Sequence, residues 1–166
     1  MNSDEDFEAA YLKYSDKIFR FLYLHTKDPY LSEDITSEVF VRAWKNWKKF
    51  KPDYVQAWLY KIANNILIDY WRSKKNKKDV SLEETINAGM EPSYDKDFIE
   101  EIQKNEDIKV LKSAVDLLPE NLKNVVILRF IEGMSAKEAS EILKISEVNV
   151  RVLQYRALIK LKEKLK

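Results

Sequence analysis

Apolar residues recur at helical spacing in three blocks along the first half of the chain, and polar residues fill the positions between them. The first block predicts a helix over residues 4–26, which ends before an Asp-Pro pair. The second predicts a helix that Ser32 caps and that ends at Phe50, and the third a helix from Val55 to about Ser73. Three amphipathic helices of this length predict one small helical bundle.

The chain between the two helical halves has little hydrophobic periodicity. Residues 77–96 mix lysines, acids and an Asn-Ala-Gly turn, which predicts a flexible linker. The helical pattern returns with a fourth helix from Phe98 that Pro119 closes, followed by a fifth that stops near a glycine. The pattern therefore predicts an all-α protein with two small helical domains, over residues 1–76 and 97–166.

The last fifth of the chain has the layout of a helix-turn-helix motif. Ser135 followed by Glu138 predicts a capping box that opens a short helix ending at Leu143. After a three-residue turn, Ser146 caps a last helix that runs to about Lys164. In such motifs the second helix enters the DNA major groove. These two helices complete a four-helix C-terminal domain.

The last helix is predicted to have one buried and one exposed face. We place Val150 on the inner face. At about 100° per residue, Leu153, Ala157 and Leu161 then lie beside it. The other side carries groups that bind base edges, thymine methyl groups or phosphates. A solvated basic helix at the end of a bundle is the alternative. Our candidates for duplex contact are Asn149, Arg151, Val152, Tyr155 and Arg156.

The third predicted helix interleaves aromatic, amide and basic side chains ahead of a lysine cluster. Aromatic rings stack on unpaired bases, cations hold the backbone, and an amide can test the edge of an extruded base. The alternative is that Trp58 and Trp71 simply pack in the core. Our candidates for contact with unpaired DNA are Tyr60, Lys61, Asn64 and Asn65.

The second predicted helix carries a charged row beside a large aromatic surface. Asp34, Glu38 and Arg42 follow one another at intervals of four residues. An ion pair between Glu38 and Arg42 explains part of this row, for about 0.2–0.5 kcal/mol. A docking face for another protein is the alternative, because aromatic side chains with flanking charges are common interface anchors.

Composition mainly excludes other functions. The 166 residues include no cysteine and a single histidine, so we expect no disulfide, no metal site and no cysteine nucleophile. The chain also lacks the common nucleotide-binding and hydrolytic motifs, so we expect neither an enzyme nor a cofactor. No stretch approaches the roughly 18 apolar residues of a membrane span. We therefore predict a cytoplasmic protein without membrane insertion.

The net charge of +1 hides a strong segregation of charge along the chain. Residues 79–108 hold 2 basic and 10 acidic side chains, whereas the final 19 residues hold 6 basic and 1 acidic, a balance of 6 − 1 = +5. An acidic connector thus separates two neutral-to-basic parts, and the basic end coincides with the predicted groove helix.

Together the two blocks resemble the extracytoplasmic-function (ECF, group four) sigma factors of bacterial RNA polymerase. SEDITSEVFVRAW and AWLYKIANNILIDYWR are similar to region two of that family, and LPENLKNVVILRFIEGMSAKEASEILKISEVNVRVLQYRALIKL is similar to region four. The resemblance implies a factor that binds core RNA polymerase and promoter DNA and directs promoter-specific initiation. Region two would melt the minus-ten element, and region four would read the minus-thirty-five duplex. An anti-sigma factor is a further candidate partner.

The resemblance also implies roles for individual residues. Four residues of the last helix match the family's groove-facing positions: Arg151, Val152, Tyr155 and Arg156. Lys144 stands where the family usually has glycine, so we expect it in the left-handed conformation. The second helix would face polymerase through Asp34, Glu38, Arg42 and Trp44, and the third would hold a flipped minus-ten base with Tyr60, Lys61 and Asn65, beside the loop around residues 50–54.

Two other classes of function fit parts of the same pattern. One is an autonomous helix-turn-helix regulator whose first three helices dimerise, which predicts a two-fold symmetric operator. The other is an accessory protein that only bridges proteins to DNA. Specific transcript starts after addition of the chain to core polymerase distinguish the sigma factor from both.

Overall fold

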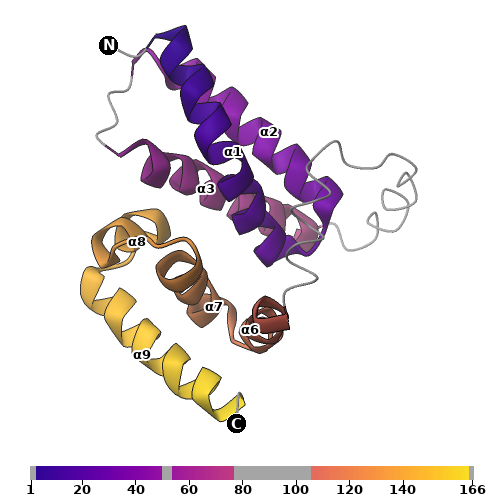
Figure 1. Ribbon diagram of the computed structural model, residues 1–166, viewed down its shortest axis with the longest axis vertical. Helices are drawn as coiled ribbons and strands as arrows, with labels where there is room; N and C mark the ends of the chain where they lie inside the picture. Colours follow the sequence, from indigo (N-terminus) through magenta and orange to yellow (C-terminus); the bar gives the residue numbers. More distant parts are fainter. Residues whose placement is uncertain (1–2, 50–53, 77–105, 165–166) are drawn as a thin grey trace. The chain divides into compact units, whose positions relative to one another are not determined.

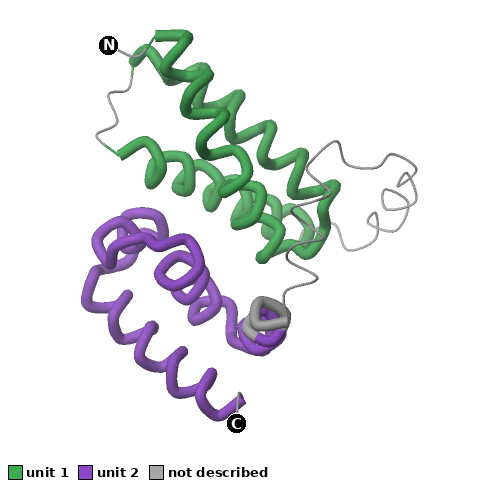
Figure 2. Tube along the Cα trace, in the orientation of Figure 1, with its two compact units in different colours: residues 1–94 green, residues 95–166 purple. Residues whose placement is uncertain are grey.

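The computed structural model describes residues 3–49, 54–76 and 106–164. These residues form helices and short connections, with no strand among them. The chain divides into two compact units, residues 1–94 and 95–166, which Figure 2 colours separately. The predicted all-α fold with two small helical domains is confirmed. The predicted linker over residues 77–96 lies outside the described residues.

The first unit is a bundle of three helices, α1 (Asp4–Thr26), α2 (Pro29–Asn46) and α3 (Val55–Asn76), each in contact with the other two (Figure 1). The first helix has the predicted bounds. The second begins and ends a few residues earlier than predicted, and the third continues past its predicted end at Ser73.

Side-chain and backbone caps set the two ends of α1. The Ser3 hydroxyl accepts from the Asp6 amide at 3.1 Å, and the Ser3 amide donates to the Asp6 carboxylate at 3.0 Å. The hydrogen bond from the Ser3 amide holds the pKa of Asp6 below its usual value, since it favours the charged carboxylate. At the other end, Lys27 adopts the left-handed conformation and its amide donates to the Tyr23 carbonyl at 2.8 Å.

The prediction that Ser32 caps the second helix is wrong. Asp28 is the cap, and its carboxylate accepts from the amides of Tyr30 and Leu31 at 3.0 and 3.2 Å. Pro29 follows as the first helical residue, where its fixed φ suits the helix and its missing N–H removes no bond. Ser32 lies one turn inside α2, where its buried hydroxyl donates to the Asp28 carbonyl at 2.7 Å.

Aromatic side chains of α2 and of the residue that follows it pack against α1. The ring of Phe7 on α1 meets Trp44 and Trp47 edge to face, with centroids 4.9 and 5.5 Å apart. Phe40 meets Tyr11 in the same way at 4.9 Å. The Trp47 indole N–H donates to the backbone carbonyl of Ser3 at 2.9 Å. These ring contacts and the indole hydrogen bond therefore join the start of α1 to the end of α2.

The second unit contains α6 (Glu106–Asp116), α7 (Glu120–Val126), α8 (Ala136–Leu143) and α9 (Glu147–Lys164), and a π-helical turn over Ile127–Ile131 extends α7 (Figure 1). The predicted start of the fourth helix at residue 98 lies outside the described residues. α9 contacts α6, α7 and α8, so the last helix closes the unit.

The π-helical turn is a feature that the hydrophobic pattern did not predict. The Glu132 amide donates to the Ile127 carbonyl at 2.8 Å, and the Met134 amide reaches the Leu128 carbonyl at the same distance. Gly133 then reverses the chain with φ at +70°, a conformation open to glycine at no steric cost. Such turns insert one extra residue and are frequent at functional sites.

Candidate interfaces with DNA and polymerase

The α8–turn–α9 segment is a helix-turn-helix with the predicted caps. Ser135 and Glu138 form the reciprocal box, with both hydrogen bonds at 3.0 Å. Lys144 adopts the left-handed conformation, with φ at 59° and ψ at 42°, as predicted. The Ser146 hydroxyl accepts from the Asn149 amide at 3.1 Å and so caps α9.

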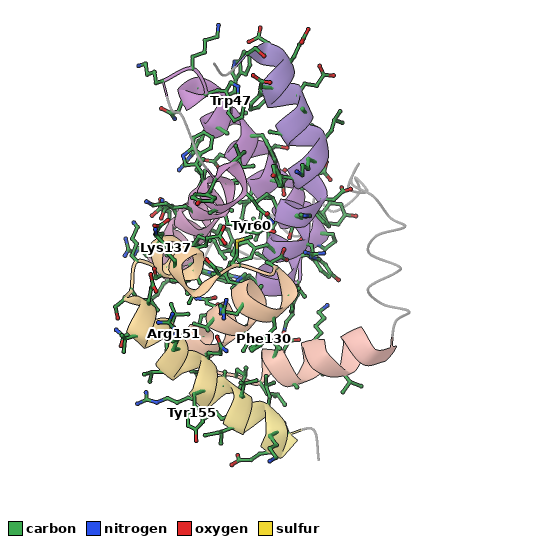
Figure 3. All side chains as sticks on the ribbon, turned by 60° about the vertical axis from the view of Figure 1, so that its left-hand side comes forward. Trp47, Tyr60, Phe130, Lys137, Arg151 and Tyr155 are labelled. Carbon is green, nitrogen blue, oxygen red and sulfur yellow. The ribbon has the colours of Figure 1, made fainter. Side chains whose placement is uncertain are left out.

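α9 has the two faces that its sequence predicts. Val150, Ala157 and Leu161 are buried, and Leu153 is half-buried beside them. The other side is exposed, and Tyr155 keeps 68% of its surface. Arg151 and Tyr155 project from this helix in Figure 3. The exposed candidates are Asn149, Arg151, Val152, Tyr155 and Arg156.

A polar anchor fixes α9 against the turn that precedes α8. The Arg129 side chain, at the π-helical turn, donates from Nε to the Gln154 amide oxygen at 2.9 Å and from Nη1 to the Met134 carbonyl at 2.6 Å. This anchor joins residues 25 positions apart in the sequence, so neither helix alone indicates it.

In the first unit, a pocket of about 340 Å³ lies between α2 and α3. α3 contributes the half-buried ring of Trp58 and the side chains of Ile62 and Asn65. α2 and the turn that follows it contribute polar groups at spacings of four and three residues. The polar side chains that line the pocket on this side are Arg42 and Asn46 of α2 and Lys49 of the turn that follows it.

Hydrogen bonds fix the α2 side of the pocket. Arg42 donates from Nη2 to the Glu38 carboxylate at 2.6 Å, which makes the ion pair that the i,i+4 spacing predicts. The Asn46 amide nitrogen donates to the Arg42 backbone carbonyl at 2.9 Å. An aromatic ring, an amide and cations around one concave site match the needs of a flipped base.

Two of the four residues predicted to contact unpaired DNA lie in the core instead. Tyr60 is fully buried, with its ring edge to face against Phe21 at 5.2 Å. Asn64 keeps 3% of its surface. These side chains point into the bundle because they occupy the inner face of α3, whereas Lys61 is exposed and Asn65 lines the pocket. The α3 candidates for DNA contact are therefore Lys61 and Asn65.

The four residues predicted to face polymerase divide between different sides of α2. Asp34 and Glu38 lie on the exposed middle of the helix. Trp44 is 46% exposed and leans on Phe7 of α1, whereas Arg42 lines the pocket beside α3. The surface of α2 that points away from the bundle thus carries the carboxylates of Asp34 and Glu38.

Three residues were not predicted from the sequence. Asn46 and Lys49 line the pocket of the first unit, and Arg129 supports α9 in the second. Asn46 and Lys49 were not candidates, although Asn46 lies one turn after Arg42 on α2 and Lys49 follows in the turn after the helix. Arg129 was missed because its partner Gln154 belongs to another helix. Only the packing of one helix on another reveals such groups.

Comparison with known proteins identifies both halves of the chain. Residues 10–77 match the family model for sigma-70 region 2, and residues 108–161 match that for sigma-70 region 4. The chain is 32% identical over 161 residues to the ECF RNA polymerase sigma factor SigM of Bacillus subtilis, with 93% of this chain and 92% of SigM covered. It is 28% identical over 158 residues to SigX of the same organism, with 93% and 81% covered.

Solved structures share the fold. RpoE of Bartonella quintana, in complex with the anti-sigma factor NepR, matches with a TM-score of 0.72 at 20% identity over 97% of each chain. CnrH, in complex with the cytosolic domain of CnrY, matches with a TM-score of 0.67 at 21% identity over 98% of this chain and 89% of CnrH.

A region 2 bundle followed by a region 4 helix-turn-helix defines a transcription initiation factor. The chain belongs to the sigma-70 family, in its ECF group of RNA polymerase sigma factors. It directs promoter-specific initiation by RNA polymerase, and the reading as an autonomous helix-turn-helix regulator is excluded. Among the described helices, none has the length and apolarity that a bilayer crossing requires.

Proposed function

We propose that the two halves of the chain divide promoter recognition between paired and unpaired DNA. In this scheme a domain over residues 97–166 reads the minus-thirty-five duplex, and a domain over residues 1–76 holds the opened minus-ten strand. The observation that carries the proposal is the α2–α3 pocket, which combines a Trp58 ring with the Asn65 amide and two cations.

The duplex contact is assigned to the exposed face of α9. Arg151 and Arg156 can bind guanine or phosphate, and Asn149 can pair with adenine. The apolar atoms of Val152 and Tyr155 suit thymine methyl groups. Support comes from the exposure of all five side chains and from the rigid caps at the start of α9.

The minus-ten contact is assigned to the α2–α3 pocket, with Asn65 at its wall and Lys61 exposed on α3 beside it. Extruding a base costs a few kcal/mol of stacking and pairing, so the pocket must return a similar amount through stacking and hydrogen bonds. Stacking on one aromatic ring contributes about 1–3 kcal/mol, and Trp58 supplies such a ring.

Docking on core polymerase is assigned to the outer surface of α2. Asp34 and Glu38 are exposed there, and the half-exposed Trp44, on the side of the helix toward α1, is an aromatic anchor. Because the protein acts together with RNA polymerase, we also assign it to the cytoplasm. It contributes binding energy for melting and carries out no bond chemistry itself.

An anti-sigma factor is the proposed regulator. The fold relatives RpoE and CnrH are each described in complex with a protein, the anti-sigma factor NepR and the cytosolic domain of CnrY. Co-purification of the full chain from its native cells, with identification of any bound protein in the absence of polymerase, tests this assignment.

Reconstituted transcription tests the proposed function as a whole. Core polymerase plus the chain should give discrete transcript starts on a genomic template library, whereas core alone should not. Mapping of the starts should reveal two upstream sequence elements. Random starts at the rate of core alone would contradict the proposal.

Two substitutions test the division of labour. Arg156→Ala should weaken recruitment to promoter duplex about tenfold or more, since one good base contact contributes about 1–3 kcal/mol. Asn65→Ala should leave recruitment unchanged and impair opening. Duplex binding and permanganate reactivity of the same promoter, measured on both variants, separate the steps. Equal loss of duplex binding in both would contradict the division.

A further inference from the structure

Arg42 lines the α2–α3 pocket, although its neighbours in the sequence suggest that it faces polymerase. The charged row on α2 groups it with Asp34 and Glu38, on a helix assigned to polymerase. The packed bundle instead makes its side chain a wall of the α2–α3 pocket, across from Trp58 and Asn65. The inference developed from this position rests on the proposed base-holding function of that pocket.

The position of Trp44 supports a separation between the pocket and the surface assigned to polymerase. Two residues apart on a helix that turns about 100° per residue, Arg42 and Trp44 point about 160° apart. Trp44 accordingly meets Phe7 of α1 at 4.9 Å, whereas Arg42 lies on the α3 side. A flat partner surface that covers Trp44 therefore does not also cover the pocket mouth.

The ion pair holds Arg42 at that mouth. Nη2 of Arg42 lies 2.6 Å from Oε1 of Glu38, and both side chains remain about half exposed, at 45% and 49%. A guanidinium has five N–H donors in a fixed fork, so the bond to Glu38 leaves others for a ligand. Glu38 thus acts as a positioning residue, because it fixes the long arginine side chain in one direction.

The pocket is rich in donors. Arg42 and Lys49 are cations that only donate, and Asn65 adds an amide. The Asn46 nitrogen is already bonded to the Arg42 carbonyl at 2.9 Å. Thymine, cytosine and guanine carry carbonyl oxygens that accept such bonds, whereas adenine has no carbonyl and accepts only at ring nitrogens, with an amino donor beside them. An amino group facing the two cations would meet no acceptor on them.

We propose that Arg42 is a specificity-determining residue of the base pocket, that Glu38 positions it, and that the pocket selects an extruded base with a carbonyl oxygen over adenine. The observation behind it is the convergence of Arg42, Lys49 and Asn65 on one concave site. Arg42 then acts on DNA, while Asp34 and Trp44 remain for polymerase.

The test uses the full chain in holoenzyme and a fork-junction DNA as the probe. Selection from a pool with a randomised single-stranded minus-ten segment, performed with wild-type holoenzyme, gives the preferred sequence. Five versions of that DNA are then made at each position, one for each base and one abasic. Wild-type holoenzyme should prefer a carbonyl base over adenine at least tenfold at one position.

Arg42→Ala should reduce that preference to less than threefold and leave affinity for core polymerase unchanged. On the abasic probe, wild type and Arg42→Ala should bind equally well, because the base that Arg42 contacts is missing. Glu38→Gln should give an intermediate preference. Lys45→Ala is the matched control, since it removes an exposed cation of α2 that does not line the pocket, and it should retain the wild-type preference.

Other results would overturn the assignment. If Arg42→Ala weakens binding to core polymerase and leaves the base preference intact, Arg42 is a polymerase contact. A pocket position at which wild-type holoenzyme prefers adenine would refute the carbonyl rule. These failures are distinct from failure of the proposed function, in which wild-type holoenzyme would give no specific transcript starts at all.

Discussion

Tyr60 and Asn65 show that residues of similar chemistry on one helix can have different roles. Both belong to an aromatic and amide-rich stretch that suggests contact with unpaired bases. Tyr60 occupies the inner face of α3 and packs on Phe21, whereas Asn65 faces the pocket. Residue type identified the chemistry, but the direction of each side chain depended on which face of α3 the bundle buries.

Substitution of Tyr60 tests its role as a core residue. Tyr60→Ala should lower the free energy of unfolding by about 3–5 kcal/mol, since removal of a buried aromatic ring leaves a cavity. Chemical denaturation of the full chain measures this change. The same substitution should affect DNA binding only through loss of folded protein.

Tyr60→Phe is the matched variant, because it keeps the ring and its contact with Phe21. It should retain the minus-ten opening of wild type in holoenzyme. A folded Tyr60→Phe protein that fails to open the promoter would show instead that the hydroxyl contacts DNA.

At the scale of elements, the caps explain why several helix bounds could be predicted. The partners of these caps are only three residues apart in the sequence. This holds for the box formed by Ser135 and Glu138 and for the bond from the Asn149 amide to Ser146. The cap of α2 was predicted wrongly because serine is a common cap near a helix start. Asp28 is the better cap here, since it directly precedes a proline in the first helical position.

The turn between α8 and α9 contains a strained residue. Lys144 has φ at 59°, a conformation that costs a residue with a Cβ about 1–2 kcal/mol. Lys144→Gly should therefore raise the free energy of unfolding of the second unit by up to about 1 kcal/mol, the remainder being offset by the greater entropy of glycine in the unfolded chain.

Thermal or denaturant unfolding of Lys144→Gly and Lys144→Ala, side by side with wild type, measures this strain. The alanine variant keeps the steric cost and should match wild type. Equal stabilisation by both substitutions would contradict the argument from the left-handed conformation and would implicate the lysine charge instead.

At the scale of the whole molecule, the charge distribution separates recruitment from recognition. The net charge is only +1, and the basic excess is concentrated in the final residues of the chain. Few phosphates can be neutralised at once by such a molecule, so electrostatic attraction to DNA is weak. Polymerase must therefore supply much of the affinity for the promoter.

The free chain should accordingly bind promoter duplex no more tightly than micromolar in physiological salt, in the range of non-specific binding at about 10⁻⁴–10⁻⁶ M. Holoenzyme should bind the same DNA at least a hundredfold more tightly. Fluorescence anisotropy across a salt series measures both. Nanomolar binding by the free chain would contradict this dependence on polymerase.

The sequence alone determined the all-helical fold, most helix bounds and the two faces of α9. These features depend on interactions within a few residues, such as capping bonds and the 3.6-residue spacing of apolar positions. The placement of Val150 inside and Tyr155 outside followed from that spacing and agrees with their burial.

Only the tertiary structure decided which groups from different helices meet. The pocket joins Arg42 of α2 and Lys49 of the following turn to Asn65 of α3. The Arg129 anchor reaches Gln154 on α9, and the Trp47 indole bonds to a carbonyl 44 residues away. Helical periodicity gives the angle of a side chain about its own axis but not the neighbour that it faces, because that depends on how the helices pack.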